Sequence, residues 1–135
     1  MIKYIRSLVF YMTLLAWGGA MYLLFSPNPL FWLGYRPHIP ERGTHLVMFS
    51  CLAFVTYISQ YRPKFFATLL WMCAFGMISE IIQYFEPPRT LELADFAEDV
   101  LGSLFGVCCG FTACRIAQKL VARYRLYRSS LTAKT

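Results

Sequence analysis

The chain alternates long uncharged stretches with short segments in which prolines and charges gather. Four stretches are dominated by apolar residues, and we interpret each as a membrane-spanning helix, at about 8–25, 45–61, 65–85 and 96–114. The first and third are long enough for a helix to cross the hydrocarbon core, whereas the apolar runs within the second and fourth, 46–61 and 100–114, are short. Local bilayer thinning or snorkelling side chains can accommodate that deficit. The pattern predicts an all-α, polytopic membrane protein, a bundle of four transmembrane helices.

The segments between these stretches have the composition of loops and of a tail. Residues 26–44 contain four prolines, 62–64 read Arg-Pro-Lys, and 86–94 begin with Glu-Pro-Pro-Arg, so the flanking helices should end there. The basic segment 115–135 follows the fourth stretch. We expect it to be a cytoplasmic tail, a helix that is solvated or lies on the membrane surface, attracted to anionic lipid. The whole chain, 1–135, is then one membrane domain.

The first apolar stretch also has features of a secretory signal peptide. Lys3 and Arg6 form a basic segment ahead of it, and residues 18–20 read Gly-Gly-Ala, which resembles a cleavage site. The apolar run nevertheless continues through 21–25. Cleavage would also leave an odd number of spans, which fits the distribution of charges badly. We therefore predict that this stretch is retained as the first helix.

The composition supports a membrane protein and argues against nucleic-acid binding. Hydrophobic residues make up 58% of the 135 residues and charged residues only 15%, whereas a soluble domain carries about 25% charged residues. The formal net charge is +6, but the basic residues stand at the ends of apolar stretches, where they anchor helices at the membrane surface. The five cysteines lie within apolar stretches and form no Cys-x-x-Cys pair, so we interpret them as small side chains at helix interfaces.

The basic and acidic residues are divided unequally between the two sides of the predicted bundle. With the N-terminus inside, the inner segments hold ten of the thirteen basic residues, and the outer loops hold only Arg36, Arg42 and Arg89. This positive-inside bias predicts an N-in, C-in orientation. Acidic residues contribute little to topology, so their gathering in or near the outer half indicates a polar site on the outer face. These acids are Glu41, Glu80, Glu86, Glu92, Asp95, Glu98 and Asp99.

The third apolar stretch carries an acidic residue where a membrane helix seldom tolerates one. Glu80 lies about two turns before the loop that follows, and an acid at that depth is costly unless it is paired or reaches water. Gly76, Glu80 and Gln83 are spaced four and three residues apart, so they share one helix face. Glu80 is therefore a candidate functional residue, and a structural ion pair is the alternative.

A matching polar stripe begins the fourth stretch. Its members recur at intervals of four, three, four and four residues, which is again one helix face, and they are Asp95, Asp99, Gly102, Gly106 and Gly110. The glycines form a Gly-x-x-x-Gly-x-x-x-Gly motif that lets helix backbones approach closely. We predict that this face packs on the face of the third helix that carries Glu80, so that the acids converge near the outer surface. A helix-capping role for Asp95 is the alternative.

Cationic side chains could join the acids on the outer side. Arg89 lies in the loop between the third and fourth helices. It either pairs with Glu80 or Asp95, or its guanidinium group binds a phosphate or carboxylate of a ligand. His45 opens the second helix and is either structural, a metal ligand or a general base. A divalent cation is accordingly one cofactor that the sequence allows. The candidate ligand-binding residues are Arg42, His45, Glu80, Gln83, Arg89, Asp95 and Asp99.

Two blocks of these residues resemble the VanZ-like family of bacterial membrane proteins. Residues 41–49, Glu-Arg-Gly-Thr-His-Leu-Val-Met-Phe, look like the family's Asp-Lys-x-x-His-Phe-x-x-Phe signature at the start of a helix. Residues 80–106 look like its Glu-x-x-Gln, Pro-Gly-Arg and Asp-x-x-x-Asn-x-x-Gly-x-x-x-Gly run. The resemblance covers about 41–110. Asp99 departs from the family's Asn and adds a negative charge.

The resemblance implies a location and a process but no reaction. It implies a multi-pass protein of the bacterial cytoplasmic membrane that serves the cell envelope. The family is named for a protein that gives low-level resistance to teicoplanin, a glycopeptide that acts on cell-wall precursors at the outer surface, and other members accompany polysaccharide-biosynthesis genes. The implied partners are membrane lipids, a lipid-linked glycan precursor, or membrane proteins of polysaccharide synthesis.

Three functional hypotheses follow from these observations. The first is a non-catalytic envelope factor that binds a lipid-linked glycan, a glycopeptide or a partner protein at the outer polar site. The second is an intramembrane enzyme acting on a lipid-linked phosphate or glycan, with Glu80 or Asp95 as acid or base and Arg89 holding phosphate. The third is a small transporter subunit, which fits less well because the polar residues gather at one end of the predicted bundle. The sequence leaves open whether the protein is an enzyme.

Overall fold

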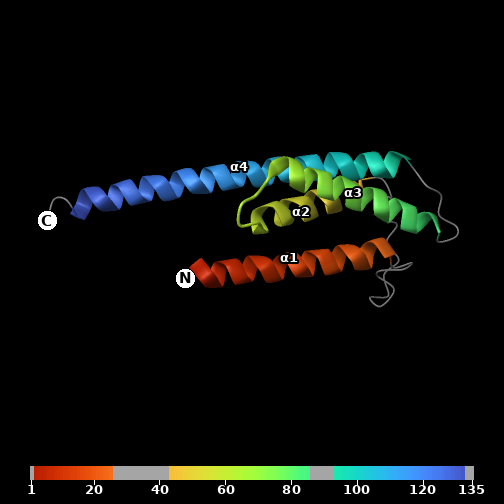
Figure 1. Ribbon diagram of the computed structural model, residues 1–135, viewed down its shortest axis with the longest axis horizontal. Helices are drawn as coiled ribbons and strands as arrows, with labels where there is room; N and C mark the ends of the chain where they lie inside the picture. Colours follow the sequence, from red (N-terminus) through yellow and green to blue (C-terminus); the bar gives the residue numbers. More distant parts are fainter. Residues whose placement is uncertain (1, 26–42, 86–92, 133–135) are drawn as a thin grey trace.

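The regular secondary structure in the described part of the chain is all α-helix. A computed structural model describes residues 2–25, 43–85 and 93–132, and these form four α-helices (Figure 1). The helices are α1 (Ile2–Phe25), α2 (Thr44–Ser59), α3 (Phe65–Tyr84) and α4 (Leu93–Thr132). The predicted all-α class is confirmed.

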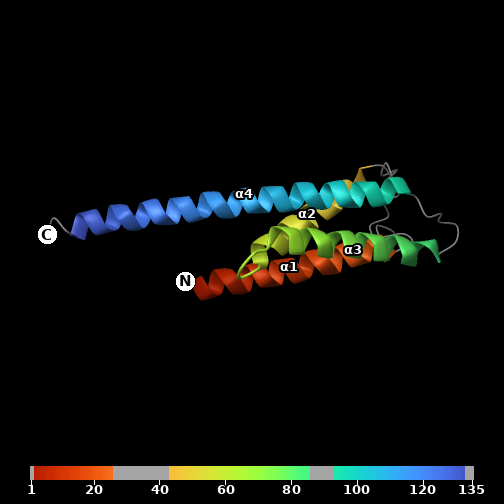
Figure 2. The same cartoon turned by 45° about the horizontal axis from the view of Figure 1, so that its top comes forward.

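The four helices run alongside one another with alternating chain direction. The end of α1, the start of α2, the end of α3 and the start of α4 lie at one end of the molecule, on the right in Figure 1, which we call the site end. The opposite end holds the start of α1 and the turn between α2 and α3. Helix α2 contacts each of the other three helices. In both views, the second half of α4 extends well beyond the other helices (Figures 1 and 2).

The boundaries of α2 follow from local sequence. Gly43 precedes the helix with φ +88°, a left-handed conformation that side-chain-bearing residues rarely adopt, and its carbonyl accepts a hydrogen bond from the Val47 N–H at 3.1 Å. At the other end, the Gln60 side-chain amide donates to Thr68 Oγ1 at 2.7 Å across the turn to α3. Pro63 stands in that turn, where a proline is expected to end a helix. The turn predicted at 62–64 is thus present and is closed by a side-chain bond.

Close backbone packing joins α4 to α2. A Cβ atom added at Gly102 or Gly106 would collide with the backbone carbonyl oxygen of Leu46 or Ser50, and one added at Gly110 would lie 2.9 Å from the Tyr57 ring. At Gly102 and Gly106, only glycine allows this approach to the backbone of α2. The glycine stripe therefore packs on α2.

This packing corrects the prediction that the stripe faces the Glu80 side of α3. Only the acidic end of the stripe reaches that helix: a Cβ added at Gly76 would lie 3.0 Å from the Asp99 side chain. The spacing of the stripe identified residues that share one face of α4. That face is wide enough to touch two neighbours, so the spacing did not determine which helix each residue meets.

The interior of the bundle is small, and most large apolar side chains point outward. The buried apolar cluster consists of Ala20, Phe49, Leu52, Ala53, Tyr57, Met72 and Val107. On α3, by contrast, Phe66 is 81% exposed, Leu70 73% and Trp71 61%. A soluble protein seldom exposes so continuous an apolar surface. This distribution is the one expected of helices whose outer faces contact lipid.

Three helices are long and apolar enough to cross a membrane. They contain the candidate spans Ser7–Phe25, Phe65–Tyr84 and Leu93–Leu131, whereas α2 is a shorter apolar helix of 16 residues. Helix α4 is a single helix of 40 residues, roughly 60 Å long, so the segment after residue 114 continues the fourth predicted span without a break. These features support a membrane protein with transmembrane helices.

Candidate functional site

Several polar side chains are buried within this otherwise apolar bundle. Burying a polar group is costly unless it is hydrogen-bonded or binds a ligand, so each position calls for a partner. The acidic members lie in the last turns of α3 and the first turns of α4, which both belong to the site end. The buried polar residues of the described ranges are Thr68, Ser79, Glu80, Gln83, Asp99 and Ser103.

Three titratable side chains from three helices meet at the site end. His45 Nδ1 of α2 lies 2.9 Å from Asp99 Oδ1 of α4 and 4.0 Å from Glu80 Oε1 of α3. The Asp99 and Glu80 side chains are 0% and 7% exposed, and that of His45 is 17% exposed. We call these three residues the His45 cluster. The two carboxylates lie inside the bundle, and the imidazole forms the part that is most open to the surroundings.

The start of α2 is held in place from both sides of His45. One turn further along α2, the Phe49 ring lies parallel to the imidazole, with ring centroids 6.4 Å apart. Before the helix, the Gly43 N–H donates to Glu98 Oε2 at 2.9 Å. Glu98 and Asp99 are adjacent in the chain, so two successive residues of α4 hold the first turn of α2 and orient His45.

Room for Asp99 is provided by Gly76. The Asp99 side chain lies directly against the Gly76 Cα of α3, at a distance that leaves almost no space for a methyl group. Glu80 is one helical turn beyond Gly76 on the same face of α3. Because Asp99 lies against Gly76, its carboxylate is also close to that of Glu80.

The cluster has unused hydrogen-bonding capacity. Among the described residues, Asp99 Oδ2 and Ser103 Oγ are buried without a hydrogen-bond partner. Ser103 lies one turn after Asp99 on α4. Leaving a buried polar atom unsatisfied costs about 1–3 kcal/mol, so such atoms often mark a site that binds an ion, a water molecule or a substrate.

Gln83 has a structural contact within the bundle. Its side-chain amide donates to the Leu24 carbonyl oxygen at 3.0 Å. That carbonyl belongs to the last turn of α1, where carbonyl groups lack partners within their own helix. Gln83 therefore ties α3 to the end of α1.

The remaining sequence-predicted residues are placed differently. Asp95 is partly buried in the first turn of α4, where negative charge suits the helix dipole. Arg42 and Arg89 lie outside the described residues. The sequence interpretation did not single out Glu98 or Ser103. The sequence does contain a signal for both residues, because Glu98 is adjacent to Asp99 and Ser103 follows Asp99 by four residues, on the same helix face.

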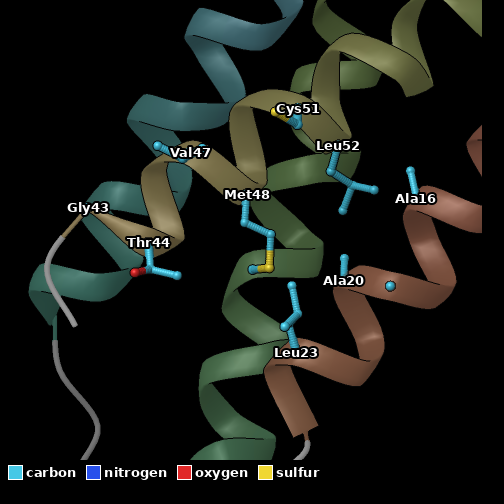
Figure 3. A pocket seen from close by; sticks show the side chains of 10 residues that line it. Ala16, Ala20, Leu23, Gly43, Thr44, Val47, Met48, Cys51 and Leu52 are labelled. Carbon is cyan, nitrogen blue, oxygen red and sulfur yellow. The ribbon is translucent and has the colours of Figure 1, made fainter. Parts of the chain in front are cut away.

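A groove of about 720 Å³ lies between α1 and α2 (Figure 3). Met48 and Leu52 of α2 face Ala20 and Leu23 of α1 across it. The groove begins at Gly43 and Thr44, next to His45, and its lining is almost wholly apolar. The lining residues are Ala16, Gly19, Ala20, Leu23, Gly43, Thr44, Val47, Met48, Cys51 and Leu52. No sequence motif marked this groove, because two separate helices contribute its walls.

The His45 cluster combines groups that bind cations and move protons. The imidazole nitrogen and one oxygen from each carboxylate lie within 4.8 Å of one another, so these residues could hold a metal ion. Comparison of the chain with protein-family models, curated proteins and solved structures found no match. The resemblance to the VanZ-like family therefore rests on the motif residues alone. The site defines the protein as an all-helical, membrane-type bundle with a buried polar cluster at one end.

Proposed function

We propose that the chain is a VanZ-like integral membrane protein of the bacterial cytoplasmic membrane that binds a lipid-linked glycan precursor at its outer face. In this role it would support the synthesis of surface polysaccharide or cell wall, or resistance to a glycopeptide such as teicoplanin. The observation that carries the proposal is the position of the apolar groove, which is lined by Gly43 and Thr44, the two residues that precede His45 in the chain.

The proposed topology has four spanning helices with both termini inside. Helix α2 is roughly 24 Å long, shorter than the hydrocarbon core of about 30 Å, and local thinning of the bilayer would accommodate it. Arg62 and Lys64 lie at the end of the bundle opposite the His45 cluster, and five further basic residues lie on α4 between 115 and 128. The positive-inside rule assigns that end to the cytoplasm and the site end to the outer face.

The proposed ligand has to match both the apolar groove and the polar residues at its end. An amphiphile with a polar head and a long apolar chain would place its head near Thr44 and His45 and its chain along Met48 and Leu52. Ligand sites of this size are typically lined by apolar residues with a few polar groups that orient the ligand. A lipid-linked glycan has both parts, and its head faces the outer side where we place the cluster.

An intramembrane enzyme acting on the same class of ligand is the second candidate. The observation that favours it is the hydrogen bond between His45 Nδ1 and Asp99 Oδ1, because a carboxylate on one imidazole nitrogen orients the ring so that the other can act on a substrate. The test is the turnover of a labelled undecaprenyl-linked substrate by the purified protein. Release of the glycan or phosphate by the native chain, and none by His45→Gln, would establish this candidate.

The binding proposal can be tested by filling the groove. Gly19 lines the groove, and a Cβ atom there would meet nothing within 4 Å, so Gly19→Leu adds a side chain without disturbing the helix packing. Gly18 is the matched control, since its surroundings are equally open but it does not line the groove. The measurement is native mass spectrometry of the protein with an undecaprenyl-pyrophosphate-linked sugar.

We expect an adduct with the native protein and with Gly18→Leu, and at least a tenfold weaker adduct with Gly19→Leu. No adduct with the native chain, or equal adducts with all three proteins, would overturn the proposed ligand.

A further inference from the structure

We propose that His45, Glu80 and Asp99 form a binding site for a divalent transition-metal cation of the Zn²⁺ or Mn²⁺ type. The inference goes beyond the proposed lipid ligand and does not depend on it. One imidazole nitrogen and two carboxylate oxygens are a ligand set that both ions accept, and three protein ligands leave positions for water or a substrate oxygen.

The geometry is close to that of a metal site. The three ligand atoms lie within 4.8 Å of one another, and the His45–Asp99 and His45–Glu80 distances are 2.9 Å and 4.0 Å. Zinc bonds of 2.0–2.1 Å in tetrahedral geometry place ligand atoms about 3.3 Å apart. The longest separation would therefore have to shorten by about 1.5 Å, which rotation within the Glu80 side chain can supply.

The electrostatics of the bundle also favour a dication. Two carboxylates carry two negative charges into an apolar bundle, where charge is costly. A dication balances both charges. It also leaves the imidazole neutral, which is the form in which histidine binds metal.

A second, independent observation comes from the unpartnered atoms. Asp99 is fully buried, yet its Oδ2 has no hydrogen-bond partner in the described part of the chain, and the same holds for Ser103 Oγ one turn further along α4. A cation next to the Asp99 carboxylate gives the second oxygen a partner, and a water molecule bound to the cation can reach the Ser103 hydroxyl.

The competing explanation is a structural ion pair between a protonated His45 and Asp99. That pair accounts for the 2.9 Å contact, but it gives no partner to Asp99 Oδ2 or Ser103 Oγ. The two explanations differ in whether the protein holds a stoichiometric metal ion, which can be measured directly.

The experiment is a titration of the full-length protein in detergent, stripped of metal, with Zn²⁺ alone. Bound zinc is measured by elemental analysis after the free ion is removed, and circular dichroism reports whether each variant keeps its helices. The site variants are Glu80→Gln and Asp99→Asn. The matched control is Asp95→Asn, which removes a carboxylate charge from the first turn of α4 outside the His45 cluster.

We expect one zinc ion per native chain, unchanged binding by Asp95→Asn, and at least tenfold weaker binding by both site variants. Mn²⁺ should displace Zn²⁺ only in large excess, and Mg²⁺ and Ca²⁺ should compete still less because they prefer all-oxygen ligands. If Asp99→Asn fails to fold, His45→Gln takes its place, with Co²⁺ as a probe whose absorption spectrum reports loss of the imidazole ligand.

Substoichiometric zinc in the native protein, full binding by the site variants, or an equal loss of binding in Asp95→Asn would each overturn the proposal. The titration contains no lipid-linked ligand. A protein that binds the lipid but no metal therefore contradicts this inference alone, and one that binds metal but no lipid contradicts only the proposed function.

Discussion

At the scale of single residues, Asp99 is the point at which three helices are tied together. It belongs to α4, it bonds to His45 of α2, and its side chain lies against Gly76 of α3. A carboxylate so fully buried is stable only when its surroundings are arranged to receive it. Gly76 and His45 are therefore expected to be as sensitive to substitution as Asp99 itself.

Gly76→Ala tests this arrangement with one added methyl group. The new Cβ would lie 3.0 Å from Asp99 Cβ and Oδ2, so the carboxylate must shift away from its partners. We expect a loss of about 1–3 kcal/mol of stability, the usual range for overpacking, partly offset by up to about 1 kcal/mol from alanine's better helix propensity. The measurement is equilibrium unfolding in mixed micelles.

Gly19→Ala is the control for this substitution. Gly19 is also helical, but a Cβ there meets nothing within 4 Å, so only the propensity gain applies and stability should stay equal or rise. Equal stability changes in the two variants would contradict the proposed crowding around Asp99.

At the scale of helices, the contact between α2 and α4 is the closest in the bundle. It depends on glycines, since the backbone carbonyl oxygens of Leu46 and Ser50 occupy the space that side chains on α4 would need. Backbone is harder to displace than a side chain. We therefore expect substitutions on this stripe to differ according to what each new side chain meets.

Gly106→Ala should be more damaging than Gly110→Ala. At Gly106 the added methyl group collides with the Ser50 carbonyl oxygen, so the two helices must separate, whereas at Gly110 it meets the Tyr57 side chain, which is easier to displace than backbone. We expect Gly106→Ala to lose about 2–3 kcal/mol and Gly110→Ala about 1 kcal/mol, measured by the same unfolding assay. The reverse order would show that α4 does not pack on α2 as described.

The protruding half of α4 should contribute little to the stability of the bundle. Residues 115–131 are exposed, and the last residue of α4 packed against the core is Cys114. A chain shortened to end at Lys119 should lose helical circular dichroism signal but keep its unfolding midpoint. A lower midpoint would show that this segment packs on part of the molecule or on a second copy.

At the scale of the whole molecule, the element layout could be predicted from the sequence better than the helix contacts. Prolines and charges separate the apolar stretches, so the turn at 62–64 was readable from local chemistry alone. His45, Glu80 and Asp99 could be expected near one another because the start of α2, the end of α3 and the start of α4 lie at the same end of the bundle. Periodicity, however, defines a face and not its neighbour, so the glycine stripe was assigned to α3 although it packs on α2.

Sequence patterns did not predict two further features, the groove between α1 and α2 and the continuity of α4. The groove between α1 and α2 is formed where two helices with small or flexible residues lie side by side, and no residue in it is unusual by itself. A helix after residue 114 was predicted from the sequence, but it was separated from the fourth span because the composition changes there, whereas α4 is one continuous helix. A change of composition marks a change of surroundings, and the helix continues because its residues there include good helix formers.

The orientation of the molecule can be tested by labelling single cysteines in intact cells. In a chain whose five native cysteines are changed to alanine, Thr44→Cys places a thiol at the site end, and Ser129→Cys places one near the far end of α4. Both positions are exposed, so a membrane-impermeant maleimide should distinguish them by side alone. We expect Thr44→Cys to react in intact cells and Ser129→Cys to react only after the cells are broken.

The charge distribution is the reason for this expectation, since the basic residues of α4 and of the turn before α3 all lie at the end opposite the His45 cluster. Labelling of Ser129→Cys alone in intact cells would place the cluster at the cytoplasmic face. An outer-leaflet glycan could then not reach His45, and the proposed ligand would have to be replaced by one delivered from the cytoplasm. Labelling of both in intact cells would mean that α4 does not carry the chain across the membrane, which would contradict the four-span topology itself.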